Sequence, residues 1–161
     1  MPSQFLLTPM VELLRPDGIV ANLKASSKKQ VLQELAKRAA DLTGQHERAI
    51  FDVLLERERL GTTGVGRGIA IPHGKLPTLP KVCALFARLE RPVDFDSIDE
   101  QPVDLICLLL APESAGADHL KALALVSRML RNPLFCEKLR GADTADAIYA
   151  LLTHTEASNA A

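Results

Sequence analysis

The chain has 161 residues, 47% of them hydrophobic and 24% charged, a composition typical of a single globular domain with a substantial buried core. Its formal net charge of −1 and its 4% aromatic content exclude the basic surface and the stacking side chains on which nucleic-acid binding depends. Three widely spaced cysteines do not indicate a disulfide framework, and the longest apolar run, 105–111, is too short to span a membrane, so we expect a cytoplasmic protein.

The first part of the chain predicts two short elements followed by two longer helices. Thr8 followed by proline is typical of a helix start, and the Pro-Asp-Gly sequence at 16–18 is typical of a turn. Ser26 or Ser27 can cap the first longer helix and Gly44 can end it, while apolar side chains recur between them with the helical period. The predicted elements are a loose segment over 1–7, a helix over 9–14, a turn over 16–18, a strand over 19–23, a helix that ends near residue 42 and a helix over 47–60.

The helix predicted over 47–60 carries an arginine on its apolar side. Ile50, Val53 and Leu54 form the inward stripe, and Arg57 occupies the next position on it. One interpretation is an arginine whose stem packs on the core, or whose charge pairs with a neighbouring carboxylate. The other is an arginine directed across the following loop at an anion. Periodicity alone leaves both interpretations open.

The second half of the chain predicts three strands followed by three helices. The run over 103–110 is almost continuously apolar, which indicates a central strand covered on both faces. Asp118 and Asn132 stand where helices are expected to begin. The predicted elements are strands over 68–71, 82–89 and 103–110, a polar connection over 91–102, and helices over 119–130, 133–140 and 144–152. We therefore predict an α/β fold over 1–161, a single-domain sandwich of a small mixed β-sheet flanked by helices, with a disordered tail over 153–161.

The segment Gly61–Lys75, GTTGVGRGIAIPHGK, is the most distinctive stretch of the chain. Its glycines predict a loop with free backbone N–H groups, and its Pro-His-Gly sequence predicts a turn that presents the imidazole of His73. The glycine spacing fits neither a Walker loop nor a dinucleotide-binding fingerprint. The four histidines lack ligand spacing and no cysteine or carboxylate cluster joins them, so we expect no metal site.

A phosphoryl group is the ligand that this segment suits best. A histidine in such a turn is more often an ordinary surface residue, but here hydroxyls, N–H groups and positive charge surround it. The hydroxyls belong to Thr62 and Thr63, and the charges to Lys75 and Arg57. A neutral imidazole has a nucleophilic nitrogen and can accept a phosphoryl group. No nucleotide site is evident, so the chain would receive that group rather than take it from ATP.

The same segment resembles the fructose/mannitol-type enzyme IIA domains of the phosphoenolpyruvate-dependent phosphotransferase system, and within them the nitrogen-regulatory branch. The sequences QPVDLICLLLAP over 101–112 and DHLKALALVSRML over 118–130 fit the same family, and the well-matched core of the resemblance covers about 26–152. The resemblance implies that His73 is phosphorylated on Nε2, that Arg57 neutralises the phosphoryl group and that His119 is a second active-site histidine. It also matches Thr62, Thr63, Gly64 and Lys75 to the phosphate-binding loop, and it implies no cofactor.

The resemblance further implies the partners. The phosphoryl donor would be a phosphorylated HPr- or NPr-type carrier protein, itself supplied by an enzyme I-type protein. The phosphorylation state would then regulate transporters or sensor kinases connected with nitrogen, potassium or carbon. The alternative is a sugar-specific IIA component that passes the phosphoryl group to a IIB protein for fructose or mannitol uptake.

Overall fold

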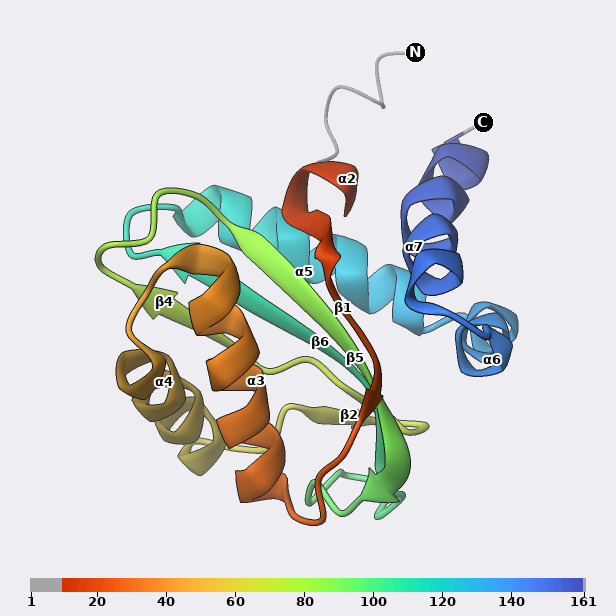
Figure 1. Cartoon of the computed structure of the whole chain (residues 1–161), viewed down its shortest axis with the longest axis horizontal. Coiled ribbons are helices and arrows are strands. Elements are labelled where there is room, and N and C mark those ends of the chain that lie inside the picture. The colour runs from red at the N-terminus through yellow and green to blue at the C-terminus, as the bar shows by residue number, and fades with distance from the viewer. Residues whose placement is uncertain (1–9, 161) are drawn as a thin grey trace.

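A six-stranded mixed sheet forms the centre of the molecule, with helices on both of its faces (Figure 1). The computed structural model describes residues 10–160, with side chains to residue 154, so the expectations for 1–7 and for Thr8 lie outside the described residues. The strands are β1 (Leu14–Leu23), β2 (Gly64–Gly66), β3 (Ile69–Ala70), β4 (His73–Leu76), β5 (Cys83–Val93) and β6 (Val103–Pro112). The helices are α2 (Met10–Leu13), α3 (Lys28–Thr43), α4 (Glu47–Arg59), α5 (Gly116–Leu130), α6 (Pro133–Gly141) and α7 (Ala145–Ala160).

The sheet order is β1-β5-β6-β3-β2, and β4 pairs with the far end of β6. Strand β6 is antiparallel to β5 and parallel to both β3 and β4, so the sheet is mixed as predicted. Residues 69–70 pair with the middle of β6, and residues 73–76 pair with its last four residues. One continuous strand thus aligns both β3 and β4.

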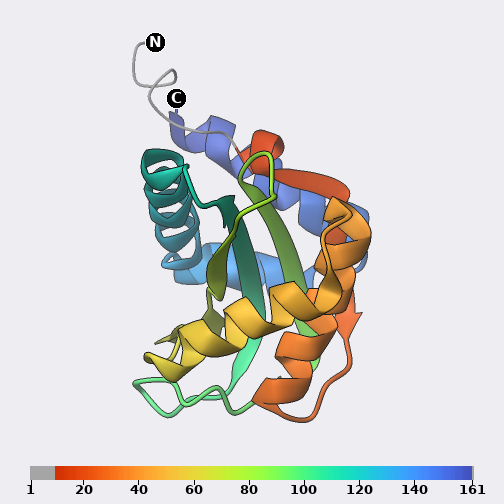
Figure 2. The same ribbon diagram turned by 90° about the vertical axis from the view of Figure 1, so that its left-hand side faces the viewer.

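Strand β6 is apolar on both faces because helices cover both. Its odd-numbered side chains from 105 to 109 join the cluster that contains α5, α6 and α7, and its even-numbered side chains from 106 to 110 join the cluster that contains α3 and α4. The view in Figure 2 shows the sheet between these two groups of helices. The prediction of a central strand covered on both sides is therefore confirmed. Within residues 10–160, none of the helices combines the length and apolar character that crossing a bilayer requires.

The predicted turn at 16–18 is wrong, because β1 passes through it. Leu14 pairs with Ala84 and Ile19 with Phe86, and the register shifts between these two pairs. The Pro-Asp-Gly sequence forms this irregularity in a strand at the edge of the sheet, where a proline without an N–H group is tolerated. Turn-forming residues here mark a bulge and do not reverse the chain.

Helix boundaries agree with the prediction where a side chain caps the helix. Ser27 accepts a hydrogen bond from the Gln30 N–H group at the start of α3, and Gly44 ends that helix with a φ of 73°. Asn132 caps α6 in the same way. Asp118 does not cap α5, which begins two residues earlier at Gly116, and α7 continues to Ala160, beyond its predicted end at residue 152.

Close packing of β4 against α4 depends on Gly74. A Cβ atom built at this position would overlap the Cγ1 atom of Val53 on α4. Valine cannot readily turn away, since branching at Cβ restricts its rotamers. Gly74 therefore lets the strand that begins with His73 approach the helix that carries Arg57.

We predict that Gly74→Ala lowers the free energy of unfolding by about 1–3 kcal/mol, because the added methyl group overpacks this contact. Urea unfolding measures the change. Gly116→Ala is the matched control, since a Cβ there meets nothing within 4 Å. Equal stability of Gly74→Ala and the unmodified protein would contradict the packing argument.

Candidate active site

His73 is the first residue of an edge strand, in contrast to the predicted turn. It pairs with Leu109 of β6, and the Leu109 N–H group donates to the carbonyl oxygen of Pro72 at 3.0 Å. Among the described residues β4 has no strand partner other than β6. The side chain of His73 is half-buried, so the backbone is fixed by the sheet while the ring remains accessible at its edge.

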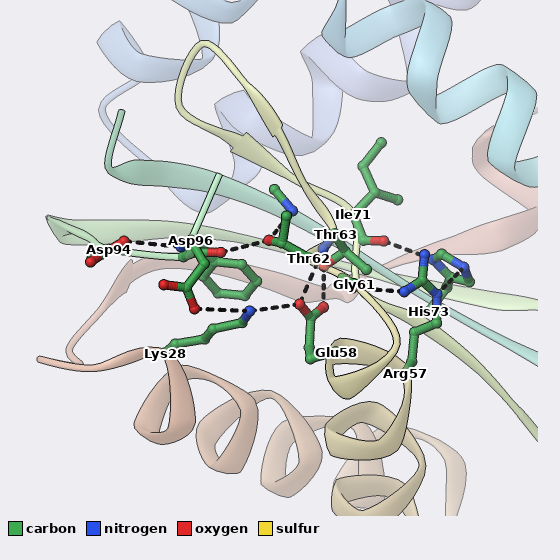
Figure 3. A network of polar contacts seen from close by, with 12 residues as sticks. Lys28, Arg57, Glu58, Gly61, Thr62, Thr63, Ile71, His73, Asp94 and Asp96 are labelled. Atoms are coloured by element: carbon green, nitrogen blue, oxygen red, sulfur yellow. Dashed lines mark hydrogen bonds and ion pairs between the residues drawn. The ribbon is translucent and has the colours of Figure 1, made fainter. Parts of the chain in front are cut away.

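The two ring nitrogens of His73 have partners of opposite kinds (Figure 3). The Nδ1 atom lies 2.9 Å from the carbonyl oxygen of Ile71, and Nε2 lies 3.3 Å from the Nε atom of Arg57. A carbonyl can only accept a hydrogen bond and a guanidinium can only donate one. The proton of the neutral ring therefore resides on Nδ1, and the lone pair of Nε2 faces Arg57. The structure gives His73 one nucleophilic nitrogen.

Arg57 connects His73 to the loop that follows α4. Its Nη1 group donates to the carbonyl oxygen of Gly61 at 2.8 Å, while its Nε group reaches His73. The guanidinium therefore extends across the loop to His73 and pairs with no carboxylate among the described residues, whereas an anion as its target stays a prediction. The buried stripe of α4 continues from Ile50 and Leu54 to Glu58, and Arg57 lies beside it.

His119 approaches His73 from the first turn of α5. The two ring centroids are 5.6 Å apart, with an angle of 69° between the ring planes. His119 is only 6% exposed, and its Nε2 atom has no hydrogen-bond partner among the described residues. Burial lowers the pKa of His119, and the neighbouring charges of His73 and Lys75 lower it further. A neutral imidazole nitrogen is thus left available beside His73.

The three predicted catalytic residues converge because of the sheet topology. Helix α4 packs on one face of the sheet and α5 on the other. Strand β4 lies at the edge between them and pairs with the end of β6 that leads to α5. Lys75 is exposed two residues beyond His73, on the same side of the strand. Arg57, His73, His119 and Lys75 therefore form one site.

Thr62, Thr63 and Gly64 hold the loop together. The Thr62 hydroxyl donates to the carbonyl oxygen of Phe95 at 2.6 Å and accepts from the Gly64 N–H group at 3.0 Å. The Thr63 hydroxyl donates to the Glu58 carboxylate, and the Thr63 N–H group donates to the same carboxylate at 3.1 Å. The Gly61 N–H group also has an acceptor, at 3.1 Å on the backbone of Glu58.

The expectation of free loop N–H groups is therefore wrong for residues 61, 63 and 64, because each of these groups has an acceptor within the chain. The two hydroxyls predicted to bind phosphate are likewise engaged with protein oxygens. Position 64 has no room for a side chain, because an added Cβ would overlap the Oγ atom of Ser97. The loop residues contribute the shape of the site, and His119 contributes a ring nitrogen that has no hydrogen-bond partner among the described residues.

Two residues next to this site had no role assigned from the sequence pattern. Glu58 is 9% exposed, and its carboxylate forms an ion pair of 2.9 Å with Lys28 at the start of α3. Glu58 lies four residues after Leu54, so the helical period could have placed it on the buried face. Lys28 lies 30 residues earlier in the chain, and no local pattern connects it with this loop.

The described residues contain no group of three or more histidine, cysteine, aspartate or glutamate side chains arranged to bind a metal ion. The three cysteines are free thiols, of which Cys107 and Cys136 are buried and Cys83 is half-buried. Burial raises the pKa of Cys83 to about 11 and that of Cys107 to about 12. These thiols stay protonated at neutral pH and do not contribute a nucleophile.

Residues 12–155 match the family described as "Phosphoenolpyruvate-dependent sugar phosphotransferase system, EIIA 2". The chain is 62% identical over 144 residues to a nitrogen regulatory protein of Bradyrhizobium diazoefficiens, covering 89% of this chain and 94% of that protein. It is 38% identical over 128 residues to the PTS system fructose-specific EIIA component of Haloferax volcanii, covering 79% and 83%. The solved structure of nitrogen regulatory protein IIA-Ntr from Neisseria meningitidis aligns with a TM-score of 0.84 at 34% identity, covering 88% and 97%. The residues matched to the family include the whole site from Arg57 to His119.

We predict that His119 makes the folded protein less stable in mild acid. Because its folded pKa is lowered, the unfolded chain takes up a proton as the pH falls through about 6.5, before the folded protein does. His119 therefore has no effect on the free energy of unfolding above that pH and lowers it below that pH. Urea unfolding at about pH 7.5 and about pH 5.5 should show a smaller loss of stability in His119→Gln than in the unmodified protein.

The matched control for this prediction is His46→Gln, which replaces an exposed histidine at the start of α4. It should retain the pH dependence of the unmodified protein. If His119→Gln loses as much stability between the two pH values as His46→Gln does, His119 is not the titrating group.

Proposed function

This chain belongs to the EIIA 2 family of the phosphoenolpyruvate-dependent sugar phosphotransferase system, and we propose from that premise that it is a phosphoryl carrier whose acceptor is Nε2 of His73. The resemblance expected from the sequence is confirmed for the family and for its nitrogen-regulatory relatives. The observation that carries the proposal is the hydrogen bonding of His73, in which the Nδ1–H group donates to the carbonyl oxygen of Ile71 and the Nε2 lone pair stays free of a proton at the sheet edge.

The reaction is an in-line displacement at phosphorus. The Nε2 lone pair of His73 forms the new N–P bond, and the bond between phosphorus and the donor breaks with its electron pair leaving on the donor. The Nδ1–H group remains hydrogen-bonded to Ile71 and stabilises the positive charge that develops on the ring. Catalysis then consists of positioning and charge neutralisation, as is usual for phosphoryl transfer.

Arg57 neutralises the transferred group. Its bond to Nε2 is long, at 3.3 Å, and a phosphoryl group arriving at Nε2 would take over this donor. The Nη1 bond to Gly61 keeps the guanidinium nearby while Nε changes partner. Arginine is suited to this role because its planar array of donors matches phosphoryl oxygens.

His119 and Lys75 complete the phosphoryl site. The unpartnered Nε2 atom of His119 would donate to a phosphoryl oxygen on His73, which requires the neutral ring to carry its proton on Nε2. Lys75 adds a second positive charge at the open side of the strand. We assign Thr62, Thr63 and Gly64 to the support of this site.

The donor in this proposal is a phosphorylated HPr- or NPr-type protein, and the purpose is regulation. Phosphorylation adds about 1.5 to 2 negative charges to the sheet edge at neutral pH. A transporter or sensor kinase that docks there would distinguish the two states by this charge. Support comes from the nitrogen regulatory protein of Bradyrhizobium diazoefficiens, with which the chain shares 62% identity.

A sugar-specific carrier is the second candidate, because the chain is also 38% identical to a fructose-specific EIIA component. In that case His73 would pass its phosphoryl group to a IIB protein. Mixing the phosphorylated protein with purified fructose- and mannitol-type IIB proteins separates the two functions. Rapid transfer to either IIB protein supports the sugar carrier, and retention on His73 supports the regulator.

We predict one acid-labile phosphoryl group per chain after incubation with phosphoenolpyruvate, an enzyme I-type protein and an HPr- or NPr-type protein. Intact-mass spectrometry detects it. His73→Gln should gain none because the nucleophile is absent, whereas His46→Gln should gain one because His46 is exposed and outside the site. A phosphoryl group on His73→Gln, or none on the unmodified protein with any donor pair, would contradict the proposal.

We predict that Arg57→Met slows phosphoryl acceptance by about 10²–10³-fold, the usual effect of removing one preorganised donor from a developing negative charge. Stopped reactions analysed by intact mass give the rate. Arg59→Met is the matched control, because that arginine is exposed and pairs with Glu56 at 3.5 Å, away from His73. Equal rates in the two variants would rule out the role assigned to Arg57.

A further inference from the structure

The Glu58 carboxylate lies at the centre of a polar network beneath the site (Figure 3). One oxygen, Oε1, accepts from the Thr63 N–H group at 3.1 Å and pairs with Lys28 Nζ at 2.9 Å. The other oxygen, Oε2, accepts from the Thr63 hydroxyl. Three donors therefore converge on one carboxylate.

This ion pair is largely withdrawn from water. The side chains of Glu58 and Lys28 are 4% and 19% exposed. The ammonium group of Lys28 also lies 4.9 Å above the ring centre of Phe95. Asp96 is a weaker partner at 3.5 Å, with a side chain that is 75% exposed. Lys28 is therefore held chiefly by Glu58 and joins the first turn of α3 to the last turn of α4.

The position of Glu58 is unfavourable for the helix that carries it. Glu58 lies in the last turn of α4, where the helix dipole disfavours a negative charge. A neutral or basic residue would suit the isolated helix better. Contacts with Lys28 and Thr63 compensate for this unfavourably placed negative charge. Such compensation is expected where a residue supports a functional site.

Glu58 acts on the active site through the loop that separates it from His73. It holds Thr63 by both the hydroxyl and the N–H group, and its own carbonyl oxygen accepts from the Gly61 N–H group at 3.1 Å. The Gly61 carbonyl oxygen in turn accepts from Arg57 Nη1 at 2.8 Å. The position of the loop therefore determines where the Arg57 guanidinium is held. The position of the guanidinium in turn determines whether its Nε group faces Nε2 of His73.

We propose that Glu58, with its charge balanced by Lys28, is a positioning residue for phosphoryl acceptance: it holds the loop 61–63 so that Arg57 faces Nε2 of His73. The expected effects on the rate of phosphoryl acceptance rest on the proposed function as a phosphoryl carrier. Glu58 itself does not touch the reacting atoms. Its removal should displace Arg57 without removing the nucleophile.

The test compares variants that break this network one contact at a time. Glu58→Gln keeps the size of the side chain but cannot accept from all three donors. Lys28→Met keeps an aliphatic stem and removes the charge. Thr63→Val removes the hydroxyl, and Thr63→Ser restores it. Arg88→Met is the matched control for loss of a partly buried cation, because the guanidinium of Arg88 donates to carbonyl oxygens of Ala21, Leu139, Arg140 and Ala142, all outside the site.

The first readout is the kinetics of phosphoryl acceptance from the phosphorylated HPr- or NPr-type protein. Glu58→Gln and Lys28→Met should lower the maximal rate by about 10²-fold, the effect expected when a catalytic group is displaced by about 1 Å. The half-saturating donor concentration should change by less than about twofold, because the docking surface is intact. Thr63→Ser should recover most of the rate lost in Thr63→Val. Arg88→Met should keep the rate of the unmodified protein at temperatures where it is folded.

The second readout needs no donor and separates this inference from the proposed function. The ¹⁵N resonance of His73 Nε2 in the unphosphorylated protein reports the hydrogen bond from Arg57. In Glu58→Gln it should move toward its position in Arg57→Met, and in Arg88→Met it should stay in place. If Glu58→Gln keeps the unmodified resonance and rate, the positioning role is overturned. If the unmodified protein accepts no phosphoryl group, the proposed function fails, and the resonance alone decides the role of Glu58.

Discussion

The hydrogen bonding of the His73 ring is the constraint on which the rest of the site depends. One ring nitrogen faces a carbonyl oxygen that can only accept, and the other faces a guanidinium that can only donate. These two contacts select one tautomer and direct its lone pair toward a positive charge. They exist only if the strand, the preceding residues and the end of α4 keep their relative positions.

The sheet topology supplies those positions. Strand β6 aligns β4 at its edge, and the same end of β6 leads into the helix that carries His119. Helices on opposite faces can thus contact one edge residue from two sides. Gly74 allows the close approach on the α4 side, and the buried Glu58–Lys28 pair holds the loop between α4 and the strand. Packing and buried charge act together to fix the geometry.

Much of the fold could be predicted because its signals are local. Ser27 and Gly44 bound α3 through their own capping contacts, and the apolar run of β6 reflects coverage by helices on both faces. Strand β4 could not be predicted in this way. Its four residues contain a glycine and follow a proline, and their extended conformation comes from pairing with a strand more than 30 residues away.

The same distinction applies to the site. The residue types of His73 and Arg57 indicated phosphoryl chemistry, and the family resemblance added His119. The sequence could not show that the loop N–H groups and the threonine hydroxyls have acceptors within the chain, because those acceptors depend on tertiary contacts. It also could not connect Lys28 with Glu58, whose pairing requires two helices to meet beneath the loop.

The most direct measurement is the location of the phosphoryl group on the His73 ring. Protein labelled with ¹⁵N in its histidines would be phosphorylated by the enzyme I-type and HPr- or NPr-type proteins and studied by ¹⁵N and ³¹P NMR. We predict that phosphorus couples to Nε2 and that Nδ1 keeps its proton and its hydrogen bond to the carbonyl oxygen of Ile71. Phosphorus on Nδ1 would contradict the assignment of Nε2 as the acceptor, because the Nδ1–H group is already hydrogen-bonded to the carbonyl oxygen of Ile71.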